Sequence, residues 1–156
     1  MKPLVEALQS DGLSVWWDAQ IEGGAGWRQA IQTELDSARC VLVAWTRRSV
    51  GPEGHFVHDE ATRAQRRHAY LPVLLEAVEP PLGFGETQAL PMAGWKGDRS
   101  DPRYRNVLEA VRAMVAGVPR GAPLALAPAS AIGRRQLMLG GTVLGVAALA
   151  QQTESP

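Results

Sequence analysis

Apolar positions along the first 115 residues recur with two spacings, which predict alternating helices and strands. Apolar residues three or four positions apart predict helices at residues 4–11, 27–38, 56–68 and 102–115. Continuous apolar runs predict strands at 13–17, 39–45 and 70–75, with a short edge strand within 89–95. Because the apolar runs do not alternate with polar residues, both faces of these strands are expected to be buried.

Local signals support these boundaries. Gly12 follows the first predicted helix and is expected to adopt the left-handed conformation that ends many helices. Asp101 followed by Pro102 is typical of a helix start, because aspartate caps the first amides and proline fits the first turn. The segments 19–26 and 46–55 contain several glycines and are predicted to be loops. The alternation predicts an α/β fold with a parallel sheet and helices on both faces.

The chain changes character after residue 115. Prolines among alanines and glycines predict a linker over 116–131, and an apolar segment follows over 132–152. Its core, Leu137–Ala150, has 14 residues, whereas a membrane-spanning helix needs about 20. Three interpretations stay open: a membrane anchor, an alanine-rich helix that packs on the domain, or the stump of a truncated longer protein. Arg134 and Arg135 precede the segment, so an anchor would leave the domain on the cytoplasmic side of the inner membrane.

Composition narrows the classes of partner and compartment. The 16 basic and 16 acidic residues give a formal net charge of zero, so there is no electrostatic reason to expect a nucleic-acid partner. Cys40 is the single cysteine, which excludes an intrachain disulfide and indicates a reducing compartment such as the cytoplasm. Because Cys40 lies in an apolar run, we expect it to be buried and to serve in packing.

Candidate chemistry gathers where the predicted strands end, because ligands of open parallel sheets bind beyond the carboxyl ends of the strands. Glu60 lies near this edge, four residues after Phe56, so the two side chains are neighbours on one helix face. An aromatic ring beside a carboxylate could hold a flat ring and act on a sugar. Spacing alone favours the alternative that Glu60 pairs with Arg63 on a solvated face.

Other patterns carry weaker signals. The loop Glu22–Gly26 precedes a helix, so its amides could approach a phosphate, but a flexible turn is favoured because no G-x-G-x-x-G pattern is present. His55 and His58 stand beside acidic residues, yet no second ligand cluster completes a metal site, and no metal is expected. The sequence contains neither a P-loop nor a G-x-S-x-G motif.

Over about residues 1–115 the order of motifs resembles bacterial Toll/interleukin-receptor (TIR) domains. The most specific segments are GLSVWWD, which leads into a glycine-containing loop, and S-V followed by F-V-x-x-E-A. The resemblance implies a flavodoxin-like sheet and assembly with other TIR domains, including self-association. It also implies NAD⁺ as a substrate, because many bacterial and plant members cleave the nicotinamide–ribose bond. No cofactor is expected besides this substrate.

The resemblance also assigns residues to that reaction. Glu60 matches the catalytic glutamate of the family, and Phe56 stands where the family usually has tryptophan. Phe56 and Trp95 are the candidate stacking residues, and Asp18 and Gly23 would line the mobile loop that serves both assembly and the ligand pocket. The resemblance thus favours the catalytic interpretation of Glu60 over its pairing with Arg63.

One departure from the family concerns the first strand. TIR domains begin with a central strand before the first helix, whereas this sequence starts at that helix, which implies a domain truncated at its N-terminus. The missing strand would lie between the 13–17 and 39–45 strands. Those two strands must then pair directly or leave backbone groups unsatisfied, so we expect lower stability than in a whole domain.

Two other functions stay open. A non-catalytic assembly module in signal transduction is favoured by the missing strand and by phenylalanine at position 56. A receiver-like phosphoacceptor domain shares the topology, but its acidic cluster is not matched: the 70–75 strand is followed by Glu76, and Asp18 stands alone.

Overall fold

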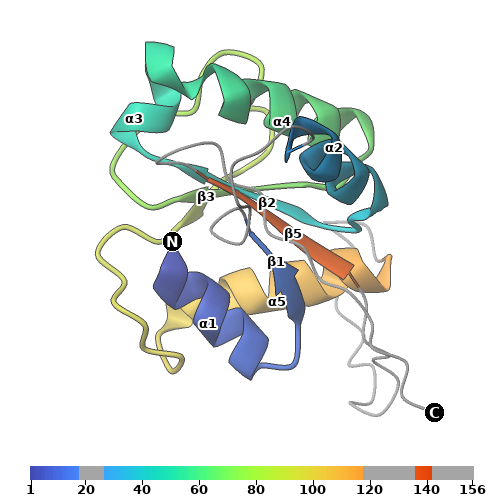
Figure 1. Ribbon diagram of the computed structural model, residues 1–156. Helices are drawn as coiled ribbons and strands as arrows, with labels where there is room; N and C mark the ends of the chain where they lie inside the picture. The colour runs from blue at the N-terminus through green and yellow to red at the C-terminus, as the bar shows by residue number, and fades with distance from the viewer. Residues whose placement is uncertain (18–26, 118–135, 142–156) are drawn as a thin grey trace, which may run out of the picture.

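The computed structural model describes residues 1–17, 27–117 and 136–141, which form one parallel sheet with helices on both faces (Figure 1). The strands, in chain order, are β1 (Ser14–Trp16), β2 (Val41–Trp45), β3 (Tyr70–Leu74), β4 (Leu90–Pro91) and β5 (Gln136–Gly141). The helices are α1 (Lys2–Ser10), α2 (Trp27–Ser37), α3 (Arg47–Val50), the 3₁₀ turn η2 (Pro52–Gly54), α4 (His55–Arg66) and α5 (Pro102–Ala116). The predicted α/β fold is confirmed.

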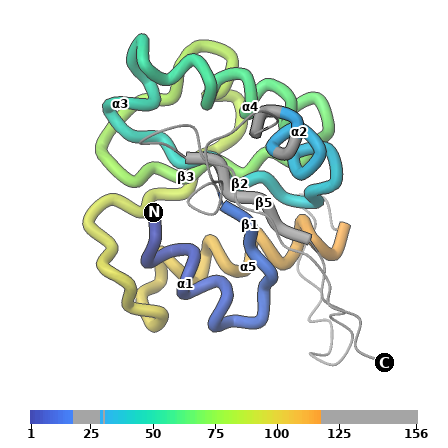
Figure 2. Tube along the Cα trace, viewed as in Figure 1, coloured from blue at the N-terminus to red at the C-terminus, as the bar shows by residue number. Residues whose placement is uncertain are grey.

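The sheet separates two apolar cores. The trace in Figure 2 shows α2 and α4 over one face and α1 and α5 over the other. Side chains of β2 alternate between them: Val41, Val43 and Trp45 join the α2–α4 core, and Leu42 and Ala44 join the α1–α5 core. Every residue of β2 is at most 1% exposed. A strand that is covered on both sides needs apolar residues at every position, which explains the continuous run in the sequence.

Most predicted boundaries lie within two or three residues of the observed ones. Gly12 has φ +82°, and the Asp101 side chain accepts a hydrogen bond from the Arg103 amide at 2.9 Å, so both helix-end predictions are confirmed. The prediction of a loop over 46–55 was wrong, since this segment contains α3 and η2. Local hydrogen bonds between Thr46 and Ser49 stabilise this short helical stretch, and apolar periodicity cannot reveal so short an element.

The C-terminal segment differs most from the prediction. Gln136–Gly141, expected to be part of an apolar helix over 132–152, forms strand β5 in the middle of the sheet, parallel to β1 and β2 (Figure 1). These two strands therefore do not pair directly, and β5 satisfies the backbone groups between them. The rest of the predicted linker and tail, 118–135 and 142–152, lies outside the described residues. Within the part of the chain that the structure describes, no helix combines the length and apolarity needed to cross a bilayer.

Candidate functional site

The turn after β2 positions the helix that carries the candidate catalytic residue. Thr46 and Ser49 cap α3 reciprocally: the Thr46 hydroxyl accepts from the Ser49 amide at 3.2 Å, and the Ser49 hydroxyl accepts from the Thr46 amide at 2.8 Å. The Ser49 side chain is fully buried, and its hydroxyl also lies 3.3 Å from the Ala44 carbonyl oxygen, to which it can donate. These bonds turn the chain sharply at the carboxyl end of β2.

Gly54 brings the start of α4 against this turn. A Cβ atom at Gly54 would lie 1.9 Å from the Ser49 carbonyl oxygen, so only glycine allows the two backbones to approach this closely. The same carbonyl oxygen accepts a hydrogen bond from Nε2 of His58 at 2.9 Å; since a carbonyl only accepts, Nε2 carries the hydrogen. Together, the close approach and the hydrogen bond fix α4 relative to the end of β2.

An aromatic cluster anchors α4 to the sheet. The Trp45 ring packs against His58 and Phe84, with centroid separations of 5.7 and 5.2 Å. Its Nε1 donates to the Tyr70 hydroxyl at 2.9 Å, which joins β2 to β3 inside the core. Burial raises the pKa of Tyr70 to about 12, and the bond from Trp45 only partly opposes this shift. Edge and tilted contacts of this kind hold α4 in one orientation.

Glu60 lies on the α4 face that turns towards the core. Glu60 is 8% exposed, and Val57 and Ala61 of the same helix are fully buried. Phe56, one helical turn earlier, is 37% exposed. The interpretation of Glu60 as part of a solvated face was therefore wrong. Arg63, its proposed partner, makes a bidentate ion pair with Asp36 of α2 instead, at 2.8 and 2.7 Å.

Burial of a carboxylate is unusual enough to mark a site. Among the described residues other than tyrosine, tryptophan and cysteine, Ser49 and Glu60 are the polar ones that are less than a tenth exposed. Both belong to the segment that leaves the carboxyl end of β2, and both face the α2–α4 side. Glu60 lies on the helix that leaves the ligand edge of the sheet, which makes it the candidate site residue of this segment.

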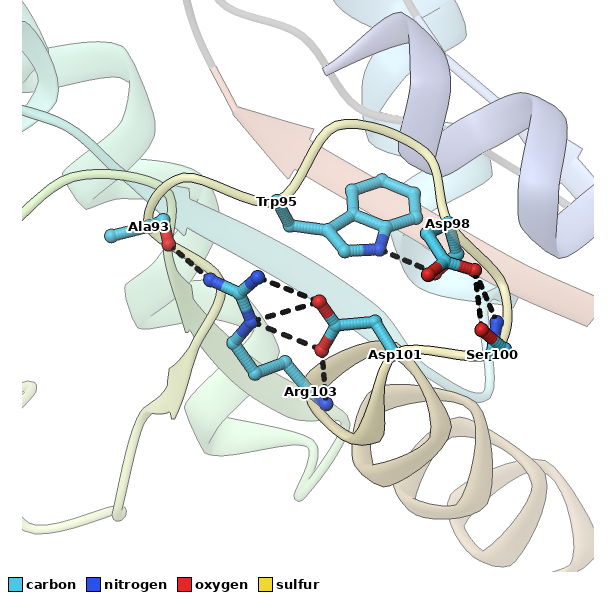
Figure 3. Close-up of polar contacts among 6 residues, drawn as sticks. All are labelled: Ala93, Trp95, Asp98, Ser100, Asp101 and Arg103. Carbon is cyan, nitrogen blue, oxygen red and sulfur yellow. Dashed lines mark hydrogen bonds and ion pairs between the residues drawn. The ribbon is translucent and has the colours of Figure 1, made fainter.

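Trp95 occupies a different place from Glu60. It precedes α5, its ring stacks on Tyr104 with centroids 5.4 Å apart, and it packs against the α1–α5 core, on the opposite face of the sheet from α4. Figure 3 shows its Nε1 donating to the Asp98 carbonyl, at 2.7 Å, and Arg103 gripping Asp101 and the Ala93 carbonyl. The structure thus does not bring Trp95 onto the Phe56–Glu60 face. Asp18 and Gly23 lie outside the described residues.

Asp11, Arg99 and Tyr104 form a cluster of hydrogen bonds on the α1–α5 side, here called the Asp11 latch. This cluster could not be predicted from the sequence. The Asp11 carboxylate accepts two hydrogen bonds from Arg99, at 3.0 and 2.7 Å, and one from the Tyr104 hydroxyl at 2.6 Å. Its pKa is lowered, chiefly by the bond from Arg99, against an opposing effect of burial. The partners lie about 90 positions away in the sequence, and no local pattern links residues so far apart. The latch joins the end of α1 to the start of α5, which is a structural role.

A hydrogen bond between Arg47 and Glu76 joins the segments that follow β2 and β3. Glu76, after β3, accepts a hydrogen bond from the Arg47 amide at 2.8 Å, where the positive end of α3 favours a carboxylate. His55, one of the two histidines considered as metal ligands, packs against Phe56 at 4.1 Å between ring centroids. Within the described residues no group of three or more histidine, cysteine, aspartate or glutamate side chains could hold a metal ion.

Comparison with known proteins identifies a family for this arrangement. A family model described as TIR domain matches residues 1–108, more than half of the 156-residue chain. The matched span contains the turn after β2, Glu60 and the Asp11 latch, and it ends before β5. Neither the curated proteins nor the solved structures yield a match to the chain.

Proposed function

Because the chain belongs to the TIR-domain family, we propose that it cleaves NAD⁺ at the nicotinamide–ribose bond, with Glu60 as the catalytic residue. One observation carries the proposal: a carboxylate only 8% exposed, on the helix that leaves the carboxyl end of a central strand, one turn after an exposed aromatic ring. Ligands of open parallel sheets bind at this edge. The resemblance of F-V-x-x-E-A to the family motif supports the same residue.

The proposed reaction needs positioning and charge stabilisation. The C1′–N bond breaks, and its electron pair leaves with nicotinamide, neutralising the pyridinium charge. The ribose becomes an oxocarbenium ion, which the Glu60 carboxylate stabilises while it orients the ribose hydroxyls. Water adds its oxygen to C1′ and releases a proton, giving ADP-ribose. Phe56, being exposed beside Glu60, offers a face for stacking the nicotinamide ring.

The test compares two neighbouring carboxylates on α4. Glu60→Gln keeps the side-chain volume and removes the charge, and we expect nicotinamide release to fall by about a hundredfold or more, as when one stabilising group is removed from an active site. Asp59→Asn makes the same change at an exposed position and should leave release unaltered. Thermal melts followed by circular dichroism show that both variants are folded. Equal release by the wild type and Glu60→Gln would exclude Glu60 as the catalytic residue.

Phe56→Ala tests the stacking role without disturbing the core, since the ring is more than a third exposed. Loss of one stacking contact is expected to raise KM about fivefold while kcat changes less. Steady-state kinetics with NAD⁺ separate the two constants. An unchanged KM would show that Phe56 does not contribute to substrate binding. The role of Glu60 would still be decided by the Glu60→Gln variant.

A second function, assembly without catalysis, is favoured by a separate observation. TIR domains in general interact with other TIR domains, and here Leu82 is fully exposed on the loop after β3. An apolar side chain held in water at a loop tip is suited to a contact with another TIR domain. Leu82→Asp should weaken self-association in analytical ultracentrifugation. If that variant dissociates while neither it nor the wild type consumes NAD⁺, the assembly module is the better account.

A further inference from the structure

Strand β5 holds the sheet together at its centre. Ser14–Trp16 of β1 pair with Gln136–Met138, and Val41–Ala44 of β2 pair with Met138–Gly141. The first part of β5 thus binds β1 and the second part binds β2. Among the described strands β5 is the sole neighbour of β1, so β1 joins the sheet only through β5.

Helices cover β5 on both sides, as expected for a central strand. α2 and α4 contact it from one face and α5 from the other. α4 carries Glu60 and packs on both β2 and β5. Removal of β5 would therefore take away part of the surface on which the helix with the candidate catalytic residue rests.

The position of β5 also coincides with the ligand crevice of this topology. Doubly wound sheets with the order 2-1-3-4-5 bind ligands between the strands numbered 1 and 3, which occupy the second and third places in the sheet. In the order β1-β5-β2-β3-β4, those places belong to β5 and β2. Gly140 and Gly141 pair with Val43 and Ala44 at the carboxyl end of β2, so the crevice wall on the β5 side is bare backbone.

We propose that Gln136–Gly141 is a positioning strand of the active site, supplied from the C-terminal part of the chain and required for the domain to be complete. It lies outside the span that matches the TIR family model, so the functional domain extends beyond residues 1–108. The strand acts by holding β1 and α4 in place around the crevice. The consequence for catalysis rests on the proposed function, whereas the placement of the strand can be measured without any activity.

Hydrogen exchange of the full chain, read by mass spectrometry in detergent-free buffer, tests the placement. Amides of Gln136–Gly141 should exchange as slowly as those of Val41–Trp45, because both strands are central. Exchange at the rate of an unstructured peptide would overturn the proposal. This comparison uses the wild type alone, so it stands even where a variant fails to fold.

A proline variant tests the dependence of β1 on β5. Leu139→Pro removes a backbone donor within the strand, and exchange in Ser14–Trp16 should accelerate by about tenfold or more while Tyr70–Leu74, which pair with β2, stay protected. Ala125→Pro, between Pro123 and Pro128, is the matched control and should change neither segment. Unaltered protection of β1 in Leu139→Pro would contradict the proposal.

The same pair of variants links the strand to catalysis. Nicotinamide release by Leu139→Pro should fall by about tenfold or more, with release by Ala125→Pro unchanged. If release is unaffected although β1 has lost its protection, the strand has no positioning role. If no sample releases nicotinamide, including the wild type, the proposed function fails, and the exchange data still decide whether β5 completes the domain.

Discussion

The two faces of the sheet bury polar groups in different ways. On the α1–α5 side Tyr104 is the one aromatic residue among the buried members of the described core, and polar groups lie at its rim in paired contacts around Asp11. On the α2–α4 side the core contains three aromatic residues, Trp45, Tyr70 and Phe84, among aliphatic ones, and it encloses a hydrogen bond between Trp45 and Tyr70. The same side holds Ser49 and Glu60, the two buried polar residues of the described chain.

This difference separates stability from function. Rim contacts such as Asp11–Arg99 keep the arginine side chain half exposed and join the end of α1 to the start of α5. Glu60 is more deeply buried, and it lies on the helix that leaves the carboxyl end of β2, where ligands of this sheet type bind. Substitutions on the α1–α5 rim should therefore alter stability alone, whereas those on the α2–α4 side should alter stability and turnover together.

The largest change in stability is expected at Gly54. Alanine there would place Cβ 1.9 Å from the Ser49 carbonyl oxygen, and the turn or α4 must shift to relieve the clash. We expect a loss of about 2–3 kcal/mol in the free energy of unfolding, together with reduced nicotinamide release. Gly85→Ala is the control, because no atom lies within 4 Å of a Cβ there. Urea denaturation of both variants gives the comparison, and equal midpoints would contradict the described turn.

High pH should lower the free energy of unfolding, because each face of the sheet buries one tyrosine. The pKa of Tyr70 is raised from 10.0 to about 12, and the pKa of Tyr104 is also raised, by burial and then by its bond to Asp11. Above pH 10 an unfolded tyrosine ionises while the folded one stays neutral, so stability is complete below pH 10 and falls as pH rises. For Tyr70 the loss approaches about 2 kcal/mol near pH 12.

Variants that lack one tyrosine measure how much of this pH dependence each of the two residues causes. Tyr70→Phe should retain only the part due to Tyr104, and Tyr104→Phe only the part due to Tyr70. Chemical denaturation at pH 8, 10 and 11.5 measures the slope for each. A slope that neither substitution changes would assign the alkaline loss to other groups.

The smallest effect is expected at the rim. Arg99→Ala removes an ion pair whose arginine side chain is half exposed, and should lower the free energy of unfolding only slightly at pH 7. The lowered pKa of Asp11 means that this contribution is present above pH 4 and disappears as the folded carboxylate is protonated at lower pH. Nicotinamide release should remain at the wild-type level. A large loss of nicotinamide release in this variant would contradict the expectation that substitutions on the α1–α5 rim alter stability alone.

The sequence predicts the alternating helices and strands of the first 115 residues well, and it predicts strand β5 poorly. Continuous apolar runs such as Val41–Trp45 and the Asp101–Pro102 helix start depend on local physics, so both could be read directly. Strand β5 could not, because a short apolar run does not distinguish helix from strand, and its partners are about 100 positions away.

Site residues follow the same rule. Glu60 and Phe56 could be linked by helical spacing and by the family motif, but the burial of Glu60 emerges only when α4 packs on the sheet. Trp95 was predicted as a stacking residue for the ligand, whereas its observed stacking on Tyr104 depends on how α5 docks. The contact between Gly54 and Ser49 is a matter of backbone distance, which no spacing of residue types encodes.

If the buried carboxylate of Glu60 takes part in the cleavage of NAD⁺, the purified full chain should release nicotinamide. The assay is run at high protein concentration, with and without a crowding agent that promotes assembly, on the wild type, Glu60→Gln and Asp59→Asn. We expect release by the wild type and Asp59→Asn, and its loss in a folded Glu60→Gln variant. No release from a folded wild-type chain under either condition would contradict this expectation.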